Sequence, residues 1–136
     1  MSSDLHDEVW LIKSRTNPFP VQGEMDLSGG TVTVTVTGGK DCTSGMRDHL
    51  EEQTGIAGLA ARLESGEAVR VLEFTPSAAA VSFPMTAGGY IAKVDVGDKT
   101  WYIALAYPAG GGIQNMMSLK KGRKLAKVWK DALGAS

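Results

Sequence analysis

Threonine and valine alternate without interruption from Thr31 to Thr37, and this run constrains the fold more than any other stretch of the chain. Successive residues of a β-strand point to opposite faces of a sheet, whereas a helix would scatter the same residues around its axis. Val32, Val34 and Val36 therefore predict the core face of a strand. The threonines predict the opposite face, which meets water or another strand.

A second pair of strands can be aligned residue by residue. Gly97-Asp98 predicts a two-residue turn between residues 90–96 and 99–107, so that Val96 faces Lys99. The same alignment pairs Val94 with Trp101, Ala92 with Ile103 and Tyr90 with Leu105 on an apolar face, and Lys93 with Tyr102 and Asp95 with Thr100 on a polar face. Turn chemistry and periodicity agree, and together they predict a half-buried antiparallel hairpin.

Further strands and a helical insert are predicted from local periodicity. The strands cover residues 8–15, 23–27, 68–75 and 80–84, each bounded by proline or glycine. Between about residues 43 and 64 the apolar spacing becomes helical. Gly55 disfavours one long helix, at a cost of about 1 kcal/mol relative to alanine. The insert is therefore predicted to be two short helices with a break near Thr54-Gly55.

The C-terminal segment, residues 117–133, predicts one amphipathic helix that ends before Gly134. Its apolar stripe is Leu125, Val128, Trp129, Ala132 and Leu133. Most of its lysines and its arginine fall on the other side. Such a stripe requires an apolar surface, which the strands can supply.

The fold class predicted from these segments is α+β. We expect residues 1–136 to form a single domain, built as a strongly bent antiparallel sheet or partly open barrel. The helical insert interrupts the strands, and the C-terminal helix covers one open end. No segment has the character of a signal peptide, and none approaches the roughly 18 apolar residues of a membrane span. With the single Cys42, this favours a cytoplasmic location, with a peripheral membrane location as the alternative.

The charges are unevenly distributed along the chain. Residues 1–116 contain 8 Lys/Arg and 14 Asp/Glu, a net charge of −6, whereas residues 117–136 contain 6 and 1, a net charge of +5. The candidate binding residues on the C-terminal helix are Lys120, Lys121, Arg123, Lys124 and Lys127. This face predicts attraction of an anionic partner, or else a solvated helix surface.

The order of the elements resembles the pleckstrin-homology-like superfold, and within it the GRAM-like and bacterial PH-like domains. The likeness is carried by the opening hairpin around residues 23–34, the late hairpin 90–107 and a terminal helix with Trp129. It implies a PH-like scaffold that serves as a binding module. The insert is longer than a plain strand connection. The early loops carry Asn17, Pro18, Gln22 and Glu24 in place of the basic signature of phosphoinositide binders.

Catalytic and metal chemistry find little support in the residues. His6 and His49 lack a second histidine or a cysteine at metal-ligand spacing. Cys42 precedes a predicted helix, where a thiol pKa can fall, but inert thiols are common at such boundaries. The segment 38–44 lies where a phosphate loop would lie, yet Asp41 stands where that motif needs a hydroxyl. We expect no enzyme activity, no metal and no cofactor.

Several binding modes remain open. Gly110, Gly111 and Gly112 predict either an anion-binding nest of backbone N–H groups or a hinge. Met116-Met117 and the threonine face of residues 31–37 favour a protein or peptide partner, or a homodimer. An anionic lipid surface is the alternative. Nucleic acid is disfavoured as a partner, because residues 1–116, with a net charge of −6, would repel a polyanion.

Overall fold

The computed structural model describes residues 4–12, 21–38, 43–83, 90–105 and 113–134, with only the backbone described over 113–119. The strands are β1 (Leu5–Ile12), β2 (Val21–Ser28), β3 (Thr31–Thr37), β4 (Ala68–Phe74), β5 (Ala79–Ser82), β6 (Ile91–Val96) and β7 (Lys99–Ala104). The helices are α1 (Ser44–Thr54), α2 (Leu59–Glu64) and α3 (Ile113–Leu133), with a short 3-10 turn, η1 (Pro76–Ala78), between β4 and β5. This confirms an α+β architecture.

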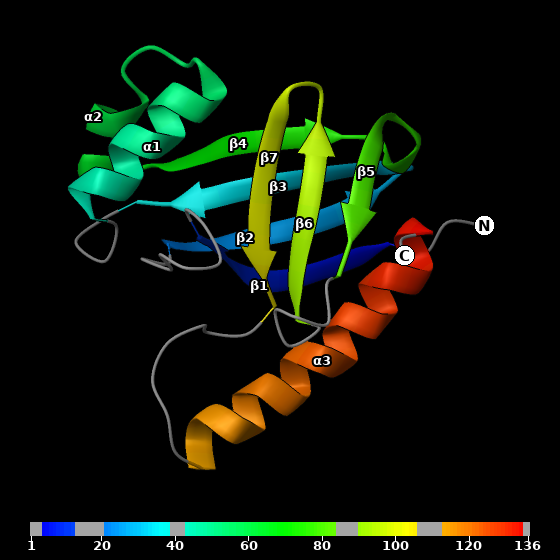
Figure 1. The fold of residues 1–136 in the computed structure, drawn as a ribbon. Coiled ribbons are helices and arrows are strands. Elements are labelled where there is room, and N and C mark those ends of the chain that lie inside the picture. Colours follow the sequence, from blue (N-terminus) through cyan, green and yellow to red (C-terminus); the bar gives the residue numbers. More distant parts are fainter. Residues whose placement is uncertain (1–3, 13–20, 39–42, 84–89, 106–112, 135–136) are drawn as a thin grey trace.

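The seven strands form one antiparallel sheet in the order β4-β3-β2-β1-β7-β6-β5, with β4 and β5 as its edges. The sheet bends strongly, so that β5, β6 and β7 cross in front of β1 to β4 (Figure 1). The bend lies at β1, which pairs with β2 along most of its length and with β7 only from Trp10 to Ile12. The sheet does not close into a barrel.

The first hairpin follows the predicted pattern. Val32, Val34 and Val36 are fully buried, and the threonines between them are partly exposed. Gly29 and Gly30 both have positive φ, which suits the tight turn that joins β2 to β3. Strand β1 begins at Leu5 rather than at residue 8, because its pairing with β2 already starts with Leu5 opposite Leu27.

The predicted register of the second hairpin is confirmed from the Val96–Lys99 pair through the Ala92–Ile103 pair. The expectation that Tyr90 shares the main apolar face is wrong. Tyr90 packs instead against a second small cluster on the outer face of the sheet. This outer cluster consists of the buried Ile12, Ile91 and Ala104, with the partly buried Trp10, Tyr90 and Tyr102 around them. The face of the second hairpin that was predicted to be polar, with Lys93 and Tyr102, is therefore apolar at one end.

The insert forms two helices, as predicted, with the break at Gly55 in the left-handed conformation. The Thr43 side chain caps α1 by accepting a hydrogen bond from the Met46 N–H at 3.2 Å. The insert lies at the end of the bent sheet near the β6–β7 turn, where Gln53 Nε2 donates to the Thr100 carbonyl at 2.7 Å (Figure 1). It contributes four buried side chains to the core: Met46, Leu50, Leu59 and Leu63.

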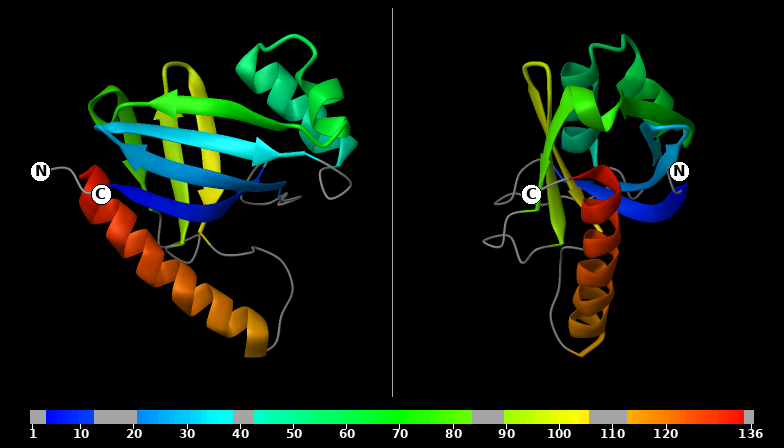
Figure 2. Two further views of the ribbon diagram at one scale, coloured as in Figure 1. Left: turned by 180° about the vertical axis from the view of Figure 1, so that it is seen from behind. Right: turned by 90° about the vertical axis from the view of Figure 1, so that its right-hand side faces the viewer.

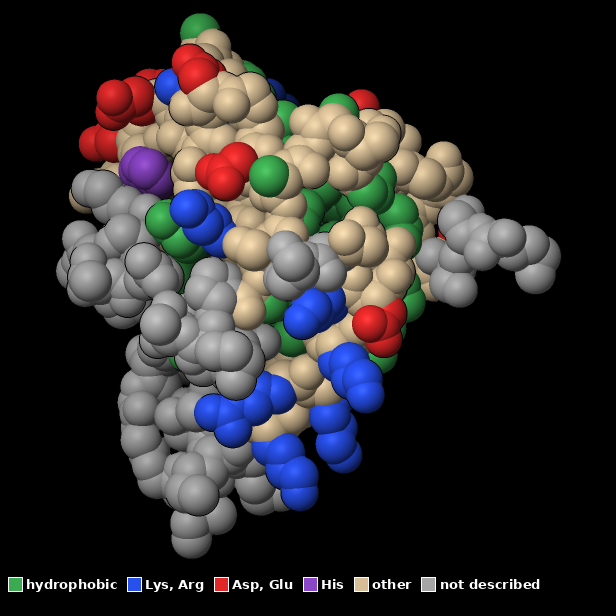
Figure 3. Space-filling model, turned by 45° about the vertical axis from the view of Figure 1, so that its right-hand side comes forward, with side chains coloured by type: hydrophobic (Ala, Val, Ile, Leu, Met, Phe, Trp, Pro, Cys, Tyr) green, Lys and Arg blue, Asp and Glu red, His purple; other side chains and the backbone are tan. Residues whose placement is uncertain are grey.

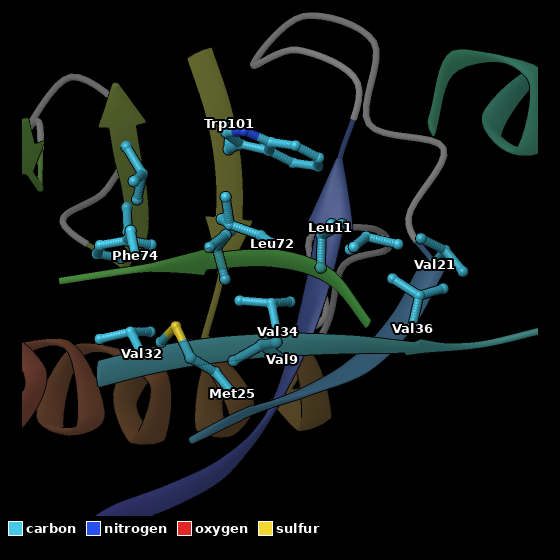
Figure 4. Packing of buried hydrophobic residues seen from close by; sticks show 14 of the residues in the cluster. Val9, Leu11, Val21, Met25, Val32, Val34, Val36, Leu72, Phe74 and Trp101 are labelled. Atoms are coloured by element: carbon cyan, nitrogen blue, oxygen red, sulfur yellow. The ribbon is translucent and has the colours of Figure 1, made fainter. Parts of the chain in front are cut away.

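The main core fills the concave side of the bent sheet (Figure 4). Trp101 from β7 lies across the space above Val34 and Leu72, which come from neighbouring strands of the other half. Since the two halves of the sheet face each other, side chains distant in sequence meet in one cluster. Burial of this apolar surface is the main contribution to stability.

Helix α3 begins at Ile113, four residues before the predicted start, and lies across the other end of the sheet (Figure 2). Trp129 is fully buried in the main core, as expected, and Leu125 and Leu133 pack against it. The prediction that Val128 and Ala132 belong to the apolar stripe is wrong, because both are exposed. Gly122 and Ala126 are buried in their place, so the helix is rotated from the expected orientation.

A candidate binding surface on helix α3

The rotation of α3 is set by its contact with β1. The Trp129 indole Nε1–H donates a hydrogen bond to Oδ2 of Asp7 at 2.8 Å. Asp7 lies on the inner face of β1, between Leu5 and Val9. Because the indole has one donor and only one end of the ring carries it, this bond fixes how Trp129 enters the core. The directions in which the other side chains of α3 point follow from the position of Trp129.

Helix α3 carries a basic face, by which we mean its exposed residues Lys120, Lys121, Arg123, Lys124 and Lys127. These are the five residues predicted from the sequence, and all of them are exposed. Lys130, on the same helix, is also exposed. The space-filling view shows the Lys and Arg side chains gathered over α3 (Figure 3). The structure therefore brings the predicted basic residues together on one side of one element.

The geometry of this face follows from helical spacing. Lys120 lies about 180° around the helix from Trp129, at about 100° per residue. Lys124 and Lys127 follow on the same side, with a rise of about 6 Å and then about 4.5 Å along the axis. The cations thus point away from the core in a row along the helix. The first turns of α3 extend beyond the strands (Figure 1).

Val128 was assigned to the core by its spacing, but it lies within the basic face. It is 47% exposed, the one large hydrophobic side chain with this degree of exposure among the described residues. Lys124 precedes it by four residues, which places the two side chains next to each other on the helix. The basic face therefore combines positive charge with one exposed apolar side chain. The sequence did not predict this combination, because hydrophobic spacing assigned Val128 to the core.

Several ion pairs of the described residues lie away from α3. Arg62 pairs with Glu67, and Arg70 pairs with Glu73. His6 pairs with Asp26 and lies 3.7 Å from Glu24. None of these pairs includes a lysine of α3, so those lysines keep their charge available for an external anion.

The outer face of β1 and β2 has the opposite character. His6 lies on this face, and its pKa is raised by a hydrogen bond to Asp26 and by the negative charge of that carboxylate. Glu24 and Asp7 make smaller contributions. Glu8 accepts a hydrogen bond from Gln22 Nε2 at 2.8 Å. We call Glu8, Glu24, Asp26 and Glu73 the acidic sheet face; sequence reasoning did not single it out, because these residues come from three separate strands.

Other predicted features contribute less. Cys42 and the loop Gly110, Gly111 and Gly112 lie outside the described residues, and so do the side chains of Met116 and Met117. Where the structure is described, no group of three or more His, Cys, Asp or Glu residues is arranged to hold a metal ion. In the same ranges, no helix is both long and apolar enough to cross a membrane.

A scan against models of known protein families, a search of curated proteins and a search of solved structures each found no match.

Proposed function

We propose that this chain is a non-enzymatic, intracellular binding module that holds an acidic protein or peptide against the basic face of α3. The observation that carries the proposal is the difference between the two sides of α3. Trp129 anchors one side of α3 in the core, and the lysines opposite it are exposed and take part in none of the described ion pairs. A rigid scaffold that presents unneutralised charge is suited to binding.

The proposal includes a PH-like scaffold. It is supported by seven antiparallel strands in one bent sheet and by a C-terminal helix that lies across one end of the sheet. In this proposal the insert α1–α2 is an addition to the scaffold, placed between β3 and β4.

The test is a binding titration with a fluorescently labelled poly-glutamate peptide, followed by anisotropy at low and moderate salt. We expect saturable binding that weakens with salt, because screening shortens the range of surface charges. Lys124→Glu/Lys127→Glu should abolish binding. Lys93→Glu/Lys99→Glu is the matched control, with the same change in net charge away from α3, and should bind like the wild type. Equal loss in both variants would refute a role for this particular face.

A second candidate function is binding to an anionic lipid surface. Val128 favours it, because an exposed apolar residue among lysines can enter the headgroup region while the lysines meet lipid phosphates. Co-sedimentation with neutral and anionic vesicles tests it. Val128→Ser should lower vesicle binding and leave poly-glutamate binding unchanged. Absence of binding to anionic vesicles at low salt would eliminate this candidate.

A further inference from the structure

The outer face of the first half of the sheet is not covered by any described helix. The insert lies at one end of the sheet, and α3 lies along another (Figure 2). Apart from the outer cluster at the end of β1, most residues that point outward are polar, including the threonines of β3. An uncovered polar sheet surface of this kind can receive a helix without any rearrangement of the backbone.

This surface also carries concentrated negative charge. Glu8 of β1 lies directly opposite Glu24 of β2, and like charges in such cross-strand pairs are destabilising. Asp26 follows on the same face, and Glu73 lies in the same cross-strand row through Thr33. Arg70 and His6 offset only part of this charge.

The spacings of the two surfaces match. Lysines on α3 recur about every 4.5–6 Å along the axis. On the sheet, Glu8 and Glu24 lie on adjacent strands about 5 Å apart, and Glu24 and Asp26 lie about 7 Å apart along β2. One helix laid on the sheet can therefore place Lys124 and Lys127 against Glu24 and its neighbours at the same time.

We propose that the basic face of α3 in one copy of this chain docks on the acidic sheet face of a second copy. This inference rests on the proposed function and identifies the acidic partner as the chain itself. The two surfaces are different patches on different elements, so the contact is heterologous. Each copy keeps one surface unused, and association then continues head to tail instead of stopping at a closed pair.

Sedimentation velocity at several concentrations tests the proposal with two charge-reversed proteins. The helix variant is Lys124→Glu/Lys127→Glu, and the sheet variant is Glu8→Lys/Glu24→Lys. We expect the wild type to form concentration-dependent oligomers at low salt and to return to the 14.3 kDa monomer at about 0.5 M salt. Each variant alone should stay monomeric, because the helix variant lowers the charge of its basic face from +5 to +1 and the sheet variant brings its acidic sheet face from −4 to 0.

The decisive sample is an equimolar mixture of the two variants. The sheet variant still has the basic face of α3, and the helix variant still has the acidic sheet face, so these two surfaces can bind each other. The remaining surface of each protein is altered, so no third molecule can add. We expect a 1:1 complex at twice the monomer mass and no larger species. A monomeric mixture, or a wild type that is monomeric at every concentration, overturns the proposal.

Poly-glutamate binding separates this inference from the proposed function. If the sheet variant binds the peptide but does not pair with the helix variant, self-association is refuted and the proposed function stands. If the sheet variant keeps its fold by circular dichroism and binds neither, both fail. Lys93→Glu/Lys99→Glu should self-associate like the wild type, and its failure to do so would attribute association to overall charge instead of to these two surfaces.

Discussion

The indole N–H of Trp129 donates to the carboxylate of Asp7 at 2.8 Å, and this bond joins the last helix to the first strand across 122 residues of sequence. A buried indole whose donor is satisfied stabilises both partners, since an unpaired N–H in the core would cost the full price of its desolvation. The orientation of the basic face depends on this contact.

Truncation of Trp129 is the first prediction. Trp129→Ala should lower the free energy of unfolding by about 3–5 kcal/mol, because it removes a fully buried aromatic side chain. Asp7→Ala should cost about 1–3 kcal/mol by leaving the indole donor unpaired. Both values can be measured by urea denaturation followed by circular dichroism.

A double-mutant cycle isolates the bond itself. Trp129→Phe retains most of the ring and lacks the N–H, so adding Asp7→Ala to it should cost less than Asp7→Ala costs in the wild type. Strict additivity of the two changes would mean that the bond contributes nothing.

The second prediction concerns the close approach of β3 and the insert at Gly38. A Cβ there would lie 2.1 Å from the Leu63 carbonyl oxygen and 2.7 Å from the Leu63 Cα. Gly38→Ala must displace the end of α2 and should cost about 1–3 kcal/mol. Gly45 is a matched control: it lies in α1 with open space around its Cβ position, so Gly45→Ala should stabilise the protein by about 0.5–1 kcal/mol. Thermal melts of the two variants should therefore shift in opposite directions.

The third prediction concerns the turn between β6 and β7. Gly97 has φ of 61°, in the left-handed region. Gly97→Ala should lower stability by about 1–2 kcal/mol, the usual cost of that conformation for a residue with a Cβ. Gly97→Asn should cost less, because asparagine tolerates left-handed backbone better. Equal losses in both variants, measured by chemical denaturation, would count against backbone strain as the cause.

The fourth prediction is a pH dependence that originates at His6. Its pKa in the folded state is raised above 6.5 by the hydrogen bond to Asp26 and the carboxylates around it. The protonated histidine is therefore favoured by folding, so its stabilising contribution is complete below about pH 6.5 and is lost as pH rises through the folded-state pKa. Unfolding free energies measured between about pH 5.5 and 8.5 should include this decline.

His6→Asn should remove that decline, and His49→Asn should leave it in place. An NMR titration of the His6 ring protons gives the pKa directly. A value at or below 6.5 would contradict the proposed interaction with Asp26.

Much of the local structure could be predicted because it is encoded in short periodic segments. Strand β3, the register of β6 with β7 and the break at Gly55 each depend on residues close together in sequence. The outer cluster around Ile12 and Ile91 could not be predicted in this way. It exists only because β1 pairs with β7, a contact that periodicity does not reveal.

The basic residues of the candidate site could be predicted from the sequence, but the rotation of α3 about its axis could not. The five basic residues of the face could be read from the sequence, since charged side chains on a helix rarely enter a core. The exposure of Val128 and the burial of Gly122 could not, because the Trp129–Asp7 contact sets the rotation of α3 and because glycine carries no hydrophobic signal. The acidic sheet face was missed since it is assembled from three strands.

The place of β1 at the bend of the sheet has a consequence for folding kinetics. Strands β1 and β2 are neighbours in sequence and can pair early, whereas Trp10 meets Ala104 only after a loop of about 90 residues has closed. Such a non-local contact slows folding. Until β7 arrives, one edge of β1 stays unpaired with Trp10 and Ile12 beside it, and an apolar strand edge of this kind is prone to aggregation. Refolding at high protein concentration should therefore lose material during the interval before the two halves of the sheet join.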